Sequence, residues 1–203
     1  MSIAGNMVES TSRDYASLAR RLLATILVLA ALVAAAWWAW QQPFMASTRM
    51  LWEIARMPAP ATLPVPVRGV EVADLVDTWG APRNTDRTHE GIDIFAARGT
   101  PVISTTRGVV GAVRERGLGG RHVWVRGPGL ENHYYAHLDD WAEGLAAGDV
   151  VLPGDVLGYV GDSGNARGTP PHLHYGIYGQ GGAVDPLPRL RAGTDAQPET
   201  TSR

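Results

Sequence analysis

The sequence predicts an all-β domain, mostly antiparallel, that follows one N-terminal transmembrane helix. Between residues 67 and 190, short runs rich in β-branched and aromatic residues alternate with glycine and proline, as in GVVGAV, RHVWVRG and HLHYGIY. Such regular short strands with glycine and proline turns are typical of sandwiches and barrels. Residues 22–40 form one apolar run that contains no charged residue, which is the pattern of a membrane-spanning helix.

The composition excludes several classes of chemistry. The chain has 203 residues, 18 basic side chains that are all arginine, and no cysteine. Without lysine it cannot form a Schiff base or carry lipoate. The segment GDVVLPGDVLGYVG resembles a lipoyl-type repeat, but the lysine that would carry lipoate is missing. Without cysteine it has no thiol nucleophile, disulfide or cysteine-bound metal. The net charge of -2 gives no reason to expect nucleic acid binding.

The apolar run has the dimensions of a single membrane span. As a helix, residues 22–40 would be about 28 Å long, close to the hydrocarbon thickness of a bilayer. Three tryptophans lie in its last four residues, and Arg20 and Arg21 precede it. These flanks place residues 1–21 in the cytoplasm and the rest of the chain outside, on the periplasmic side of the inner membrane. A cleaved signal peptide, cut near Ala34–Ala36, is the alternative.

The remaining chain divides into a spacer, a domain and a tail. Residues 41–66 contain several prolines, which predict an extended, semi-rigid stalk. Residues 67–190 form the predicted β domain. Residues 191–203 are polar and are expected to be a disordered tail.

Three short motifs contain histidines and a carboxylate that together favour a shared site, although each motif alone also fits a purely structural role: a half-buried strand pair, a surface turn with a capping aspartate, or a core histidine. His172 and His174 are two apart in a strand-like run, so both side chains point to one face. His89 and Asp93 are four apart, and Gly91 between them lets the chain turn. His137 lies in a third strand-like run, YYAHL. Two histidines and an aspartate suit a catalytic zinc ion with an open position, and they also suit iron(II).

The order of these motifs resembles the lysostaphin/LytM-type zinc peptidases. HEGIDIFAARGTPV, YYAHL and VVLPGDVLGYVGDSGNARGTPPHLHYGIY carry the resemblance, which covers about residues 66–190 and includes the DTWGAPR segment. It implies an open antiparallel fold called a duplicated hybrid motif, and cleavage of peptide bonds in peptidoglycan. It also implies a zinc ion held by His89, Asp93 and His174, with His137 and His172 as catalytic residues.

Some residues depart from the family pattern or lie outside it. His133 stands where many members have a threonine, four residues before His137. We interpret His122 as an ordinary strand residue, and we expect Tyr135 and Tyr175 to serve packing rather than chemistry.

The sequence thus predicts a membrane-anchored zinc endopeptidase that hydrolyses peptide cross-links of peptidoglycan. Its partners would be the membrane and the peptide stems, in which the resemblance implies D-alanyl–diaminopimelate as the bond that is cut. Further cell-wall protein partners are not identified by the sequence. The alternative is a catalytically silent cell-wall regulator of amidases, since some domains of this family have lost their ligands. Retention of all five site residues argues against that alternative.

Overall fold

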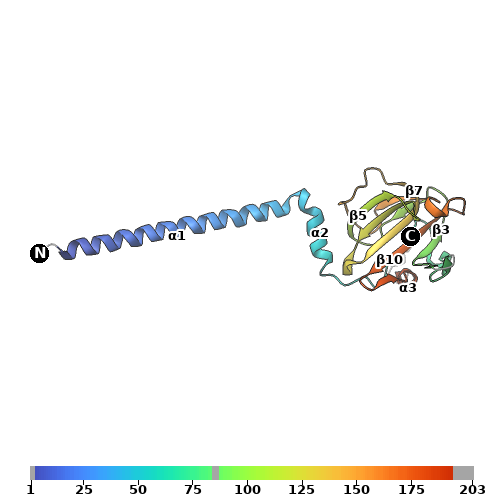
Figure 1. Ribbon diagram of the computed structural model, residues 1–203, viewed down its shortest axis with the longest axis horizontal. Coiled ribbons are helices and arrows are strands. Elements are labelled where there is room, and N and C mark those ends of the chain that lie inside the picture. Colours follow the sequence, from blue (N-terminus) through green and yellow to red (C-terminus); the bar gives the residue numbers. More distant parts are fainter. Residues whose placement is uncertain (1–2, 84–86, 194–203) are drawn as a thin grey trace, which may run out of the picture. The chain divides into compact units, whose positions relative to one another are not determined.

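Figure 1 shows the computed structural model of the chain, which describes residues 3–83 and 87–193. The chain divides into two compact units, Met1–Ala46 and Ser47–Arg203. The first unit is the helix α1, Ile3–Gln41, followed by the short 3-10 helix η1, Pro43–Met45. Within α1, Ser17–Gln41 has a mean hydropathy of 2.3 and is long and apolar enough to cross a membrane. Helix α1 begins at Ile3 and therefore extends well before the apolar run that starts at residue 22.

The second unit is built on antiparallel strands, as the sequence predicts. Every strand pairing among the described residues is antiparallel. The large sheet has the order β11-β10-β7-β6-β5-β8, with β3 on β10 and with β9 joining β4 to β7. Its strands are β3 (Ile92–Phe95), β4 (Pro101–Ile103), β5 (Gly108–Glu115), β6 (Arg121–Arg126), β7 (Asn132–Trp141), β8 (Val150–Val151), β9 (Val156–Val160), β10 (His172–Gly179) and β11 (Gly182–Val184).

Short elements complete the unit. A two-stranded ladder pairs β1, Pro82–Arg83, with β2, Arg87–Thr88. The helices are α2 (Ala46–Ile54), η2 (Val72–Asp74), η3 (Pro128–Leu130), η4 (Gly164–Ala166) and α3 (Leu187–Ala192). The fold class predicted from the sequence is thus confirmed, with an apolar N-terminal helix before an antiparallel β unit.

Strand β7 changes its partner at His137. Its first half pairs with β10, ending at Ala136, which lies opposite His174. Its second half pairs with β9, starting at Leu138. His137 lies between the two ladders with a φ of 62°, a left-handed conformation that is uncommon for residues other than glycine. The change of partner strand thus places His137 where β7, β9 and β10 meet.

The core lies beneath β7 and β10. Alternation along β10 buries Leu173, Tyr175 and Ile177 among β-branched and leucine side chains. Tyr135 and Tyr175 are fully buried, and both of their hydroxyls lie 2.8 Å from Oγ1 of Thr105. Both tyrosines therefore contribute to packing, as expected.

The segment assigned to a stalk differs from the sequence prediction from Ser47 onward. Met50 and Ile54 of α2 are buried against Val109. Further along, Leu63 lies in the main core, and the carbonyl of Pro66 accepts a hydrogen bond from the backbone N–H of Ile103 at 2.8 Å. Between the prolines, Leu63 is buried and Val65 is half-buried against the main core, so this segment packs on the domain and does not act as a spacer.

The C-terminal boundary shifts by a few residues. Helix α3 continues through Ala192, where Leu187 and Leu190 are buried. The predicted tail from residue 194 onward lies outside the described residues.

Candidate metal centre

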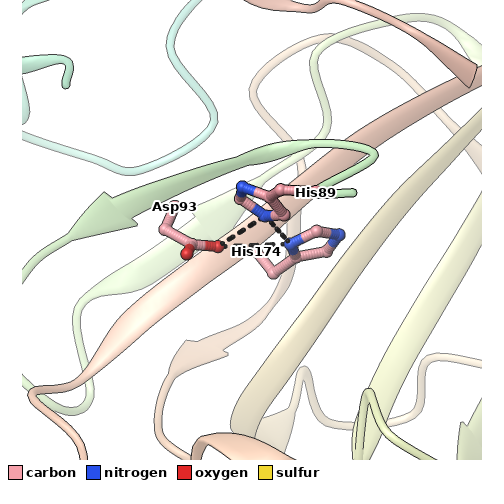
Figure 2. Close-up of side chains that lie close together, drawn as sticks. All are labelled: His89, Asp93 and His174. Carbon is pink, nitrogen blue, oxygen red and sulfur yellow. Dashed lines mark hydrogen bonds and ion pairs between the residues drawn. The ribbon is translucent and has the colours of Figure 1, made fainter. Parts of the chain in front are cut away.

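Three side chains from two distant parts of the chain converge on one point (Figure 2). Nε2 of His89 lies 2.8 Å from Nδ1 of His174 and 3.1 Å from Oδ1 of Asp93. Nδ1 of His174 lies 3.2 Å from the same carboxylate oxygen. Around a tetrahedral ion with bonds of about 2.0–2.1 Å, ligand atoms lie about 3.3 Å apart. The donor set therefore fits a divalent metal ion bound by two nitrogens and one oxygen.

The sheet and one turn bring these three residues together. Asp93 in β3 and His174 in β10 are paired residues of the antiparallel ladder. His89 lies between β2 and β3, one residue beyond the end of β2. Gly91, between His89 and Asp93, makes room for β10, since a Cβ there would lie 2.6 Å from the carbonyl oxygen of Tyr175 and 2.7 Å from Cε1 of His174. The glycine is thus needed for close approach of the strands, not for an unusual φ.

Hydrogen bonds fix which nitrogen of His89 faces the centre. Nδ1 of His89 lies 2.6 Å from the carbonyl oxygen of Thr78. A carbonyl can only accept, so Nδ1 carries the proton and Nε2 offers its lone pair to the centre. The hydroxyl of Thr78 also accepts a hydrogen bond from the backbone N–H of Asp93 at 2.9 Å. One threonine therefore holds two of the three residues.

The charge states also suit metal binding. Burial alone would raise the pKa of Asp93, but its close contacts with His174, His89 and Arg83 outweigh burial and hold the pKa well below its usual range. Burial lowers the pKa of His174, against the effect of its hydrogen bond to Asp93. An ionised carboxylate and a neutral imidazole are the forms that bind a cation.

His137 and His172, the two predicted catalytic histidines, lie beside the three donors. The ring centroids of His137 and His172 are 5.1 Å apart, and that of His137 is 5.8 Å from that of His174. Nε2 of His172 lies 4.0 Å from Oδ1 of Asp93. The structure thus brings together all five residues that the sequence selected.

Backbone carbonyls orient both of these histidines in the same way. Nδ1 of His137 donates to the carbonyl of Ser163 at 2.8 Å, and Nδ1 of His172 donates to that of Pro170 at 2.8 Å. Burial lowers the pKa of His137 to about 4. In their neutral forms, both rings therefore carry the proton on Nδ1 and leave Nε2 as an acceptor.

A cleft opens in front of the centre. Its lining consists of Arg83, Arg87, Thr88, His89, Glu90, Asp93, Leu118, Gly119, Tyr134, His137, Asn165, His174 and Tyr178. Burial raises the pKa of Tyr134 to about 12, so its hydroxyl stays protonated and can donate to a bound ligand.

Sequence reasoning missed several residues of this site. Arg83 pairs with Oδ2 of Asp93, and Thr78 holds His89 and Asp93. Both residues belong to DTWGAPR, the segment that the resemblance included without assigning it a role. Tyr134 lines the cleft, and the alternation in YYAHL could have pointed to it, because its neighbour Tyr135 faces the core.

The other two histidines do not join the centre. His122 lies in β6, as expected, and its Nδ1 donates to the carbonyl of Gly120. His133 is fully buried, and its Nδ1 lies 2.7 Å from the hydroxyl of Tyr175.

Comparison with known proteins agrees with this geometry. The model of peptidase family M23 matches residues 87–186. This part of the chain is a peptidase family M23 domain. An L-Ala–D-Glu endopeptidase from Bacillus subtilis is 44% identical over 126 residues, which cover 57% of this chain and 39% of the relative. Lysostaphin from Staphylococcus simulans is 31% identical over 110 residues, which cover 51% of this chain and 22% of lysostaphin. The chain therefore spans less than half the length of either relative.

Solved structures of the M23 family have the same fold. A Ruminococcus gnavus chain, assigned as the glycyl-glycine endopeptidase lytM, aligns with a TM-score of 0.55 at 37% identity. The alignment covers 71% of this chain and 63% of that one. Helicobacter pylori Csd3 aligns with a TM-score of 0.51 at 29% identity, over 64% of this chain and 33% of Csd3.

Proposed function

We propose that this M23 domain is a zinc-dependent endopeptidase that hydrolyses peptide cross-links of peptidoglycan. The observation that carries the proposal is the convergence of His89, Asp93 and His174 beside two further histidines whose Nε2 atoms are acceptors. A metal with three protein ligands keeps a coordination position for water or substrate, which is the arrangement of catalytic rather than structural zinc.

The metal proposed for the centre is Zn²⁺. Imidazole nitrogens and a carboxylate are ligands that zinc accepts, although iron(II) binds similar sets. When bound, the ion would polarise a peptide carbonyl and lower the pKa of a water molecule towards neutrality. His89, Asp93 and His174 would hold it, and metal analysis of protein purified without added metal distinguishes zinc from iron.

The chain's own residues can move the protons that hydrolysis requires. His172 and His137 lie beside the centre and in their neutral forms each have an unprotonated Nε2, so either ring can take a proton at that atom. After accepting a proton, the same Nε2–H can donate it to the amine that leaves. Tyr134 keeps its hydroxyl proton and can donate a hydrogen bond without any change of charge.

Peptidoglycan peptides are the proposed substrate class, whereas the names of the relatives differ in the bond they specify. They include an L-Ala–D-Glu endopeptidase, a DD-carboxypeptidase/endopeptidase from Neisseria and the glycyl-glycine endopeptidase ALE-1 from Staphylococcus capitis. We propose the D-alanyl–diaminopimelate cross-link for this chain. The cleft, open at its surface and lined by polar side chains, suits an extended peptide.

We also propose that Ser17–Gln41 anchors the protein in the inner membrane, with the domain in the periplasm. Within this helix residues 22–40 are apolar over the length of a bilayer, and Arg20 and Arg21 precede that apolar run. The N-terminal sequence of the protein recovered from membranes tests this proposal. An intact N-terminus supports the anchor, whereas cleavage after the alanines near residue 36 would show a removed signal peptide.

The decisive experiment incubates the full chain, in detergent, with purified sacculi and analyses the released fragments by mass spectrometry. Wild type is expected to release cross-link cleavage products, and His174→Ala is expected to release none. If wild type binds no zinc and leaves sacculi intact but stimulates an amidase, the regulator is the correct function. If fragments appear but end at another bond, the substrate class holds and the proposed bond is wrong.

A further inference from the structure

Arg83 contacts the candidate metal centre from outside the donor set. It belongs to the short strand β1, and its Nη2 pairs with Oδ2 of Asp93. The other oxygen of the same carboxylate, Oδ1, faces His89 and His174 at 3.1 and 3.2 Å. One oxygen of Asp93 thus faces the two histidines, and the other pairs with the guanidinium.

We propose that Arg83 is a positioning residue that holds Asp93 as a one-oxygen ligand of the metal. This inference rests on the proposed metal site. A carboxylate can bind a metal through one oxygen or through both, and its partners outside the metal decide which. With Oδ2 held by Arg83, only Oδ1 is available to an ion. A second metal–oxygen bond would occupy the position that a catalytic site keeps open.

The segment that carries Arg83 is itself fixed to the ligands. The backbone N–H of Gly80 donates to the carbonyl of His89, and that of His89 donates to the carbonyl of Ala81, both at 2.9 Å. Thr78 holds the ring of His89 and the backbone of Asp93. Residues 78–83 therefore form a support for His89 and Asp93 together, and Arg83 is the member that reaches the carboxylate.

Charge alone predicts the opposite effect from positioning. A guanidinium beside a cation site repels the cation, so removing it should tighten metal binding if charge were its whole contribution. If Arg83 positions Asp93, its removal should weaken metal binding, because the carboxylate loses its defined orientation. The sign of the change in affinity therefore separates the two roles.

Arg87 provides a matched control on the same cleft. It lines the cleft with Arg83, it pairs with Arg83 across the β1–β2 ladder, and it is exposed. Among the residues that the structure describes, Arg87 has no ion pair with Asp93. Glu90 also lines the cleft and is left unchanged in every variant.

The test measures the Zn²⁺ dissociation constant of the full chain in detergent by competition with a chromophoric chelator. Arg83→Gln is expected to bind Zn²⁺ about 10–100-fold more weakly than wild type, the range typical for partners of metal ligands. Arg83→Lys keeps the charge but not the planar fork, and should lose part of the affinity. Arg87→Gln should bind as tightly as wild type or slightly more tightly.

Folding is followed by the melting temperature of the metal-free proteins, which should stay unchanged because Arg83 is 42% exposed. If Arg83→Gln does not fold, Arg83→Lys carries the test. Zn²⁺ binding by the folded variant that equals or exceeds wild type would overturn the inference. If wild type binds Zn²⁺ but leaves sacculi intact, the proposed peptidase activity is wrong, and the Zn²⁺ affinities of the variants still decide the role of Arg83. If wild type does not bind Zn²⁺, both the proposed peptidase activity and the proposed role of Arg83 are wrong.

Discussion

Asp93 and His174 are paired residues on the adjacent antiparallel strands β3 and β10, and Oδ1 of one lies 3.2 Å from Nδ1 of the other. Directly opposite residues in such a ladder have Cβ atoms about 5 Å apart, so side chains on one face meet without further adjustment. The sheet register therefore supplies two of the three donors of the metal centre before any loop is placed. His89 adds the third donor from the segment between β2 and β3, in which Gly91 leaves room for β10.

Asp93→Asn should abolish tight metal binding while the domain remains folded. The amide keeps the shape of the carboxylate but loses the charge that the pairing with two histidines and Arg83 requires. We expect Zn²⁺ affinity to fall by more than about 100-fold, because losing a ligand costs more than losing a residue that only hydrogen-bonds to a ligand. Calorimetric titration of the metal-free protein measures it, and near wild-type affinity would show that Asp93 is not a ligand.

Gly91→Ala should disturb both folding and the centre. A Cβ at this position would lie 2.6 Å from the carbonyl oxygen of Tyr175, a backbone atom of a central strand that cannot easily move. Such overpacking costs about 1–3 kcal/mol, which lowers the melting temperature by several degrees in a domain of this size. Gly181→Ala is the control, since a Cβ there meets no atom within 4 Å. Equal melting temperatures for the two variants would contradict the close approach.

Two substitutions of His137 should distinguish the effect of its backbone conformation on stability from the effect of its imidazole on catalysis. Its φ of 62° costs a residue with a Cβ about 1–2 kcal/mol, whereas glycine adopts this conformation freely. His137→Gly should therefore be more stable than His137→Ala by about 1 kcal/mol in chemical denaturation. Both variants should keep bound zinc and lose about 100- to 10,000-fold in the rate of sacculus digestion, because each lacks the imidazole. Wild-type rates in either variant would remove His137 from the proposed mechanism.

His133 should make stability fall as the pH falls. Burial lowers the pKa of His133 to about 3, and Nε2 of the ring has no hydrogen-bond partner. An unfolded chain takes up a proton at this ring near pH 6.5, whereas the folded chain does not until near pH 3. Stability from this group is therefore complete above pH 6.5 and is lost below it, by about 2 kcal/mol between pH 8 and pH 5.

His133→Gln provides the comparison, because glutamine does not titrate. Denaturant unfolding at several pH values should show a flatter dependence for the variant than for wild type. His137 and His174 titrate in both proteins, so only the difference between the two curves reports on His133. Parallel curves would mean that His133 is already protonated or is not buried.

The sequence was informative wherever a local pattern determined the structure. The H-x-H spacing of His172 and His174 follows from strand geometry, and the glycine-punctuated runs predicted the antiparallel strands. The contact between Arg83 and Asp93 depends on a turn between them and could not be obtained from spacing. The buried positions of Met50 and Leu63 were also missed, because proline content predicts an extended backbone but not what that backbone packs against.

The most direct test of the account is metal-dependent digestion of sacculi by the full chain. The protein is stripped with a chelator, dialysed, and then given one equivalent of Zn²⁺ or iron(II), with His174→Ala treated in parallel. We expect no release of peptide fragments from the stripped protein, recovery with Zn²⁺, and none from the variant. Fragment release by the stripped protein, or equal release by His174→Ala, would contradict a metal centre built from His89, Asp93 and His174.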